Sequence, residues 1–265
     1  MANRIDVKLQ ALKEAGETAI VPFITIGFPD LQTSEALAGV IVDSGGDMLE
    51  LGIPFSDPLA DGATIQKTSF QALKQGVNVS MSLGVLRRLR ERGVNAPLIF
   101  FGYYNPFLQY GVERFLRDGA EAGLDGVIVP DLPPEEAGPF KILCDESGIH
   151  LIPLLAPTST DQRIAKACNG ARGFIYCVSL TGVTGARQEL ASGLPGMVAR
   201  IRRHTDLPVI VGFGVSRLEH VETIGRFADG AVVASALLDA IDNSPNERVL
   251  QTTREFLAGL RKQGR

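Results

Sequence analysis

The sequence predicts an α/β fold of the (β/α)8 TIM barrel type. Short apolar, β-branched runs recur along the 265 residues, and each is followed by a Gly- or Pro-containing turn and a segment of helical period. These runs do not alternate with polar residues, which indicates a parallel sheet buried on both faces. Because the composition does not change along the chain, we expect a single barrel domain over residues 1–265. An open doubly wound sheet is the alternative, although no G-x-G-x-x-G follows the first strand.

The elements follow in a regular order. Strands are expected at residues 19–26, 47–51, 97–101, 125–129, 150–154, 173–178, 208–212 and 230–234. Helices are expected at 32–44, 62–75, 79–92, 112–122, 135–147, 160–168, 195–203, 217–227 and 246–262. Thr160 is a suitable N-cap for one of them.

An extra helix is expected at the N-terminus. Residues 3–15 are charged and amphipathic, so they fit a helix that covers the bottom of the barrel and do not fit a signal peptide. The longest uncharged run, residues 96–111, is interrupted by Pro97, Gly102 and Pro106 and does not fit a membrane span. We therefore expect a cytoplasmic protein.

Composition argues against several classes of partner and cofactor. The net charge of −4 and the pI near 5.5 favour neither nucleic acid nor an anionic membrane. The three Cys and three His show no spacing typical of metal ligands, so we expect no metal site.

The stretch LELGIPFSDPLADG, residues 49–62, combines a buried strand end with three carboxylates. Glu50 lies between Leu49 and Leu51, where a charge is costly unless it is paired or protonated. Active sites of TIM barrels lie at the carboxyl ends of the strands, so the loop after this strand can place Asp61 opposite Glu50. Two carboxylates in one cavity are typical of acid–base chemistry.

Each of these carboxylates also has a structural explanation. Glu50 could form an ion pair with a basic residue of a helix, and Asp61 could be the N-cap of the following helix. Asp57 precedes a proline and is a common turn residue.

Three glycine-rich loops suggest a phosphate site at the same end. The segment GFGVS, residues 212–216, follows the seventh strand, and ASALLDA, residues 234–240, begins a short phosphate-binding helix after strand 8. Gly214 allows close approach of the backbone, and Ser235 offers its N–H and hydroxyl. The loop at residues 179–186 has the length of a lid.

Aromatic and aliphatic residues lie around the expected mouth. They are Phe23, Phe101, Tyr103, Leu154 and Tyr176. They suit a flat apolar ligand, although core packing explains each one separately. With a phosphate anchor and two carboxylates, they indicate proton transfer on a phosphorylated, partly aromatic substrate.

At these residues the sequence resembles the α subunit of tryptophan synthase, an indole-3-glycerol-phosphate lyase. The matching motifs run in order over residues 19–239: FITIGFP, LELGIPFSDPLADG, TIQ, YYNP, VIVPDLPPEE, LAPTST, GVTGA and GFGVS. The resemblance implies a retro-aldol cleavage of indole-3-glycerol phosphate to indole and glyceraldehyde 3-phosphate. It implies that Glu50 is the acid/base at indole C3 and the glycerol hydroxyl, and that Asp61 stabilises the indole N–H and the indolenine.

The resemblance also implies substrate-binding residues. They are Phe23 and Tyr103 in the aromatic slot, the active-site Tyr176, the lid residue Thr184, and Gly185, Gly214, Ala234 and Ser235 around the phosphate. Ala234 stands where many relatives have Gly, and Leu180 stands where some have Arg.

The resemblance further implies an α2β2 complex with a tryptophan synthase β subunit. Pyridoxal phosphate is expected only in that partner, and this chain is expected to use no cofactor. Residues 54–60 and 103–110 are expected to face the partner. Two other functions stay open: another phosphosugar barrel enzyme, which would need a Lys, Cys or His at the strand ends, and a binding module that mainly activates a partner.

Overall fold

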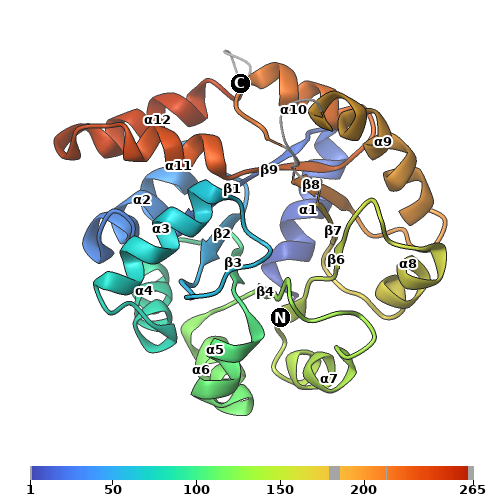
Figure 1. The fold of residues 1–265 in the computed structure, drawn as a ribbon, viewed down its shortest axis with the longest axis horizontal. Coiled ribbons are helices and arrows are strands. Elements are labelled where there is room, and N and C mark those ends of the chain that lie inside the picture. The colour runs from blue at the N-terminus through green and yellow to red at the C-terminus, as the bar shows by residue number, and fades with distance from the viewer. Residues whose placement is uncertain (1, 179–185, 213, 262–265) are drawn as a thin grey trace.

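The computed structural model describes residues 2–178, 186–212 and 214–261. Nine parallel strands form one curled sheet in the order β5-β4-β3-β2-β1-β9-β8-β7-β6, and the helices surround it (Figure 1). The strands are β1 (Ala19–Thr25), β2 (Leu49–Gly52), β3 (Leu98–Phe101), β4 (Gly126–Ile128), β5 (His150–Leu151), β6 (Leu154–Leu155), β7 (Ile175–Val178), β8 (Val209–Gly212) and β9 (Gly230–Val233). The predicted barrel class is confirmed.

The barrel closes through a single stretch of chain. β5 and β6 are consecutive halves of the predicted fifth strand: β5 pairs with β4, and β6 pairs with β7. Between them, the Ile152 N–H donates to the Val127 carbonyl at 2.9 Å, and the Pro153 carbonyl accepts from the Tyr176 N–H at 3.0 Å. The strand therefore changes partners at Pro153, which has no N–H of its own to donate.

The α-helices are α1 (Arg4–Ala15), α2 (Leu31–Asp43), α3 (Ala63–Lys74), α4 (Val79–Glu91), α5 (Tyr104–Tyr110), α6 (Val112–Ala122), α7 (Gly138–Glu146), α8 (Asp161–Cys168), α9 (Ala186–Ile201), α10 (Leu218–Gly225), α11 (Ser235–Asp242) and α12 (Val249–Ala258), with a 3-10 turn η1 (Asn246–Arg248). Side-chain caps fix several helix starts, because they satisfy N–H groups that have no partner within the helix. Thr160 accepts from the Arg163 N–H at 3.2 Å, and Asp30 accepts from the Thr33 N–H at 2.8 Å.

Helix α1 covers the bottom of the barrel, where the strands begin. Its Ile5, Leu9 and Leu12 are buried against the inward-facing side chains of the strands. Gly126 and Gly173 make this packing possible: a Cβ on either would lie 2.9 Å and 3.4 Å, respectively, from the Ile5 side chain. The predicted N-terminal cover is therefore present.

The strand side chains divide into two apolar clusters. The inner cluster contains α1 and alternate strand residues such as Val21, Ile99 and Val232. The outer cluster, between the sheet and the helices, contains the residues in between, such as Ile20 and Leu98. This alternation fixes which strand residues point into the barrel.

Three predicted element boundaries are wrong. The helix expected at 195–203 begins at Ala186, with Pro195 inside it. Residues 104–110, expected as a loop, form α5. The last helix begins at Val249, after the 3-10 turn, and not at residue 246. Within the described residues, no helix is long and apolar enough to cross a membrane.

Candidate active site

Glu50 points into the barrel. Its neighbours Leu49 and Leu51 belong to the outer cluster, so the intervening side chain lies on the inner face of β2. In the parallel register Glu50 is paired with Phe23 of β1 and with Ile99 of β3, and Ile99 belongs to the inner cluster.

The Glu50 carboxyl is buried and unpaired. The residue is 1% exposed, and neither Oε has a hydrogen-bond partner among the described residues. Burial raises the pKa of Glu50 well above its usual value, because removal from water disfavours the charged form. This shift favours the protonated carboxylic acid, which can donate a proton into the cavity. The ion-pair alternative has no support among the described residues, whose basic groups form no hydrogen bond with this carboxyl.

Asp61 lies on the loop between β2 and α3. The N-cap of α3 is Gly62, so the alternative role of Asp61 as the helix cap is wrong. The residue is half-buried. Burial raises the pKa of Asp61 to about 6, while a hydrogen bond from Tyr103 acts in the opposite direction. At neutral pH Asp61 is mostly ionised, whereas the environment of Glu50 favours its protonated form more strongly.

Tyr103 ties the Asp61 loop to the strand ends. Its hydroxyl accepts from the Ala60 N–H at 2.9 Å, next to Asp61 in the chain. Its ring packs against Phe55, with centroids 5.2 Å apart. Tyr103 is itself buried, so the loop that carries Asp61 is held by a fixed group.

Two aromatic side chains pack against glycines on the inner face of the barrel. A Cβ on Gly52 would lie 2.5 Å from the ring of Phe23, and a Cβ on Gly212 would lie 2.9 Å from the hydroxyl of Tyr176. Phe23 also makes an edge-to-face contact with Phe101 at 5.7 Å. The two glycines thus give the rings room at the strand ends, a role that the sequence interpretation missed. In the sequence, this role is indicated by a glycine at the end of a buried strand, two residues after a side chain that points into the barrel.

Tyr176 shares its surroundings with both carboxyls. Its pKa is raised, first by burial and then by the charges of Glu50 and Asp61. Since Tyr176 is on β7 and the carboxyls are on β2 and the loop after it, these groups approach one another across the barrel mouth. The structure therefore brings together Glu50, Asp61, Tyr103 and Tyr176.

The predicted phosphate residues lie at the ends of β8 and β9. Gly214, the second residue after the end of β8, has a φ of +38°, a conformation that favours glycine. Ala234 is the N-cap of α11 and has no side-chain acceptor, so its side chain does not occupy the first N–H groups of the helix. Ser235 is the first helical residue and is exposed.

Some predicted residues lie outside the described part of the chain. They are Leu180, Thr184 and Gly185, and their proposed roles stay predictions. The described residues contain no group of three or more His, Cys, Asp or Glu that could hold a metal ion. The three cysteines are buried and unbridged.

Comparison with known proteins identifies the family of this chain. Residues 9–263 match the family model described as tryptophan synthase alpha chain. A relative of that name from Roseiflexus castenholzii is 52% identical over 259 residues, which cover 98% of this chain and 99% of the relative. A relative from Geobacter sulfurreducens is 44% identical and covers 98% of each chain. The crystal structure of tryptophan synthase subunit alpha from Legionella pneumophila has a TM-score of 0.90 at 35% identity, and covers 98% of this chain and 97% of that one. This chain therefore belongs to the tryptophan synthase alpha chain family.

Proposed function

We propose that this chain is a carbon–carbon lyase that cleaves indole-3-glycerol phosphate to indole and glyceraldehyde 3-phosphate in tryptophan biosynthesis. The observation that carries the proposal is the buried, unpaired Glu50 carboxyl facing the same space as the ionised Asp61. Family membership supports the choice of substrate.

Glu50 transfers two protons in the proposed reaction. As a neutral acid, it donates its proton to indole C3, which makes C3 tetrahedral and leaves the ring cationic at N1. The resulting carboxylate then accepts the proton of the glycerol hydroxyl on the adjacent carbon. The bond between C3 and that carbon breaks, its electron pair returns to the ring, and the aldehyde forms. Glu50 ends protonated, ready for another cycle.

Asp61 stabilises the cationic intermediate. An anion beside the indole N–H interacts more strongly with the charged indolenine than with the neutral ring, so it lowers the barrier as well as binding the substrate. The hydrogen bond from Tyr103 favours the ionised form of Asp61. These proton transfers need no metal or organic cofactor in this chain.

The substrate is proposed to lie with its ring between the aromatic side chains and its phosphate at α11. Phe23 and Tyr176 flank the ring, while the backbone at Gly214, Ala234 and Ser235 binds the phosphate through N–H groups and the helix dipole. Thr184 and Gly185 are proposed to close over this end from the lid.

We also propose that the chain works in an α2β2 complex with a β subunit, which holds the pyridoxal phosphate. Residues 54–60 and 103–110 carry Leu59 and Leu108, which are 92% and 52% exposed. Between these segments lies a groove of about 390 Å³, whose lining includes Pro54, Phe55 and Pro106. Exposed leucines beside a mostly apolar groove are typical of a protein interface.

The alternative of another phosphosugar barrel enzyme has less support from the described Cys and His residues. Cys177 of β7 belongs to the outer cluster, away from the barrel mouth. His150 begins β5, at the bottom of the barrel, where it contacts Asp6 of α1 at 2.9 Å. Neither side chain lies at the strand ends that carry Glu50 and Tyr176.

An indole-release assay tests the proposal. The wild-type chain should release indole from indole-3-glycerol phosphate, and addition of a tryptophan synthase β subunit should raise the rate. Stimulation of the β reaction without indole release would favour the activating-module alternative. Absence of indole release both with and without the β subunit would contradict the lyase.

A further inference from the structure

Two polar links join α3 to α11 on the outside of the barrel. The Thr64 hydroxyl donates to Asp239 Oδ1 at 3.0 Å, and the Lys67 ammonium forms an ion pair with Asp242. Both links are exposed. In each, the partners are separated by 175 residues in the chain. The two helices therefore run in the same direction with a constant register over one turn.

The register between α3 and α11 relates these helices to the candidate active site. One helical turn before Thr64 is Asp61, and one turn before Asp239 is Ala236, next to Ser235. The same offset of 175 residues places Asp61, which lies just before α3, level with Ala236 in the first turn of α11, beside the proposed phosphate residue Ser235. Each helix carries one end of the substrate site.

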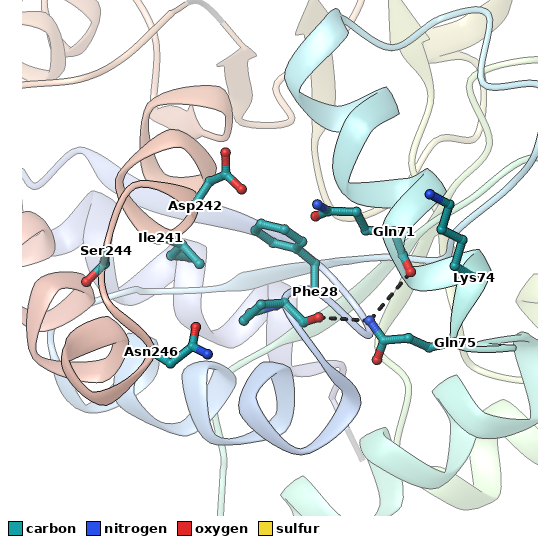
Figure 2. Close-up of a pocket in the computed structure, with 9 residues that line it drawn as sticks. Phe28, Gln71, Lys74, Gln75, Ile241, Asp242, Ser244 and Asn246 are labelled. Atoms are coloured by element: carbon teal, nitrogen blue, oxygen red, sulfur yellow. Dashed lines mark hydrogen bonds between the residues drawn. The ribbon is translucent and has the colours of Figure 1, made fainter.

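The C-terminal turns of α3 and α11 are separated by a space that side chains do not fill. A crevice of about 450 Å³ lies there. Figure 2 shows Gln71 of α3 and the C-cap Gln75 on one side and Ile241 and Asp242 of α11 on the other, with Phe28 between them. The crevice begins where the Lys67–Asp242 pair ends. The two polar links thus join the helices on the side of the crevice that is nearer their N-termini.

We propose that Thr64, Lys67, Asp239 and Asp242 are positioning residues that set the distance between the Asp61 subsite and the phosphate subsite. This inference rests on the proposed function. A ligand held at both ends gains affinity only if the two subsites are correctly spaced, whereas a ligand held at one end does not sense the spacing. Since exposed ion pairs contribute little to folding stability, loss of a link should act on two-ended binding and leave the fold intact.

The test measures dissociation constants by calorimetry. It compares single-ended ligands, which occupy one subsite, with a two-ended ligand, which occupies both. The probes are indole, glycerol 3-phosphate, and an indole joined to a phosphate by a three-carbon chain without hydroxyls, which cannot be cleaved. In Lys67→Met and Thr64→Val, the two-ended probe should bind about fivefold more weakly, while the dissociation constants of the single-ended probes change less than about twofold. With indole-3-glycerol phosphate, KM should rise by more than kcat falls. The melting temperature should stay near that of the wild type.

Matched variants sharpen the result. Lys141→Met removes a lysine–aspartate pair within α7, on a single helix, and should not change any of these values. The double exchange Lys67→Asp with Asp242→Lys should restore two-ended binding. Unchanged two-ended binding in Lys67→Met and Thr64→Val would overturn the inference, as would an equal loss with glycerol 3-phosphate alone. If the wild type itself does not bind the two-ended probe more tightly than either fragment, the proposed function fails instead.

Discussion

Buried carboxylates have opposite environments at the two ends of the barrel. At the bottom, Asp125 accepts from Arg4 at 3.0 Å and from the Leu98 N–H at 2.8 Å, and also pairs with Arg90. Asp47 likewise accepts from the Ile20 N–H at 2.9 Å and pairs with Arg261. These carboxylates connect the strand starts with α1 and with Arg261, which follows the last helix.

At the top, Glu50 is equally buried but has no such partners among the described residues. The same chemical group is therefore paired with basic residues at one end, while at the other end burial raises its pKa and it has no partner among the described residues. This difference matches the division of TIM barrels into a stability face at the strand starts and a catalytic face at the strand ends.

The largest expected effect is on catalysis at the top. Glu50→Gln keeps the shape of the side chain but removes the transferable proton, so the rate of indole release should fall about 10³-fold. The control Glu121→Gln changes an exposed glutamate of α6 and should retain the wild-type rate. A Glu50→Gln enzyme that still turns over at the control rate would remove Glu50 from the mechanism.

At the bottom, the corresponding change should act on stability. Asp125→Ala leaves the largely buried Arg90 without its carboxylate partner, and should lower the free energy of unfolding by about 3 kcal/mol in urea titrations. Asp206→Ala, which removes an exposed carboxylate just before β8, should change it by less than about 0.5 kcal/mol. Similar losses in the two variants would contradict the structural role of Asp125.

A smaller effect should appear in the pH dependence of the rate. In the proposed reaction Asp61 must be ionised to stabilise the indolenine, and burial raises its pKa to about 6. As the pH falls below this value the ionised fraction falls, so kcat/KM should drop about tenfold between pH 7 and pH 5. Asp61→Asn should have a low rate and lack this acidic limb. An unchanged limb in Asp61→Asn would assign the titration to another group.

The smallest effect should be a gain in stability from Glu50→Gln. The folded-state pKa of Glu50 lies above its unfolded value, so between these two values the folded state holds a proton that the unfolded state has released. Wild-type stability should therefore fall as the pH rises through this window, while Gln cannot ionise. At pH 8 the variant should melt a few degrees above the wild type, and the difference should shrink toward pH 4. A difference that does not change with pH would contradict the neutral, buried carboxyl.

The order of elements could be predicted because the buried strands are apolar runs bounded by Gly and Pro. Helix α5 was missed because Pro106 in YYNPFLQY suggests a loop. The structure places this proline in the first turn of the helix, where its missing N–H has no effect on helical hydrogen bonding. The change of partner at Pro153 was also missed, since it depends on which strands lie on either side.

The pair of carboxylates could be found from residues 49–62 alone, but their environments could not. The half-burial of Asp61 depends on Tyr103, which belongs to a different βα unit. The contacts of Gly52 and Gly212 with aromatic rings depend on the inward direction of β2 and β8. Such properties arise from contacts between distant segments, and local sequence patterns do not encode them.

The exchange of partners within residues 150–155 also bears on solubility at high concentration. An open sheet exposes a row of unpaired backbone groups that other molecules can extend, a common route to aggregation. Here the two end strands are one continuous stretch, and the residue at their junction is a proline that lacks the donor needed to recruit a further strand. Ring closure at this proline thus makes the described sheet a poor template for intermolecular β-pairing.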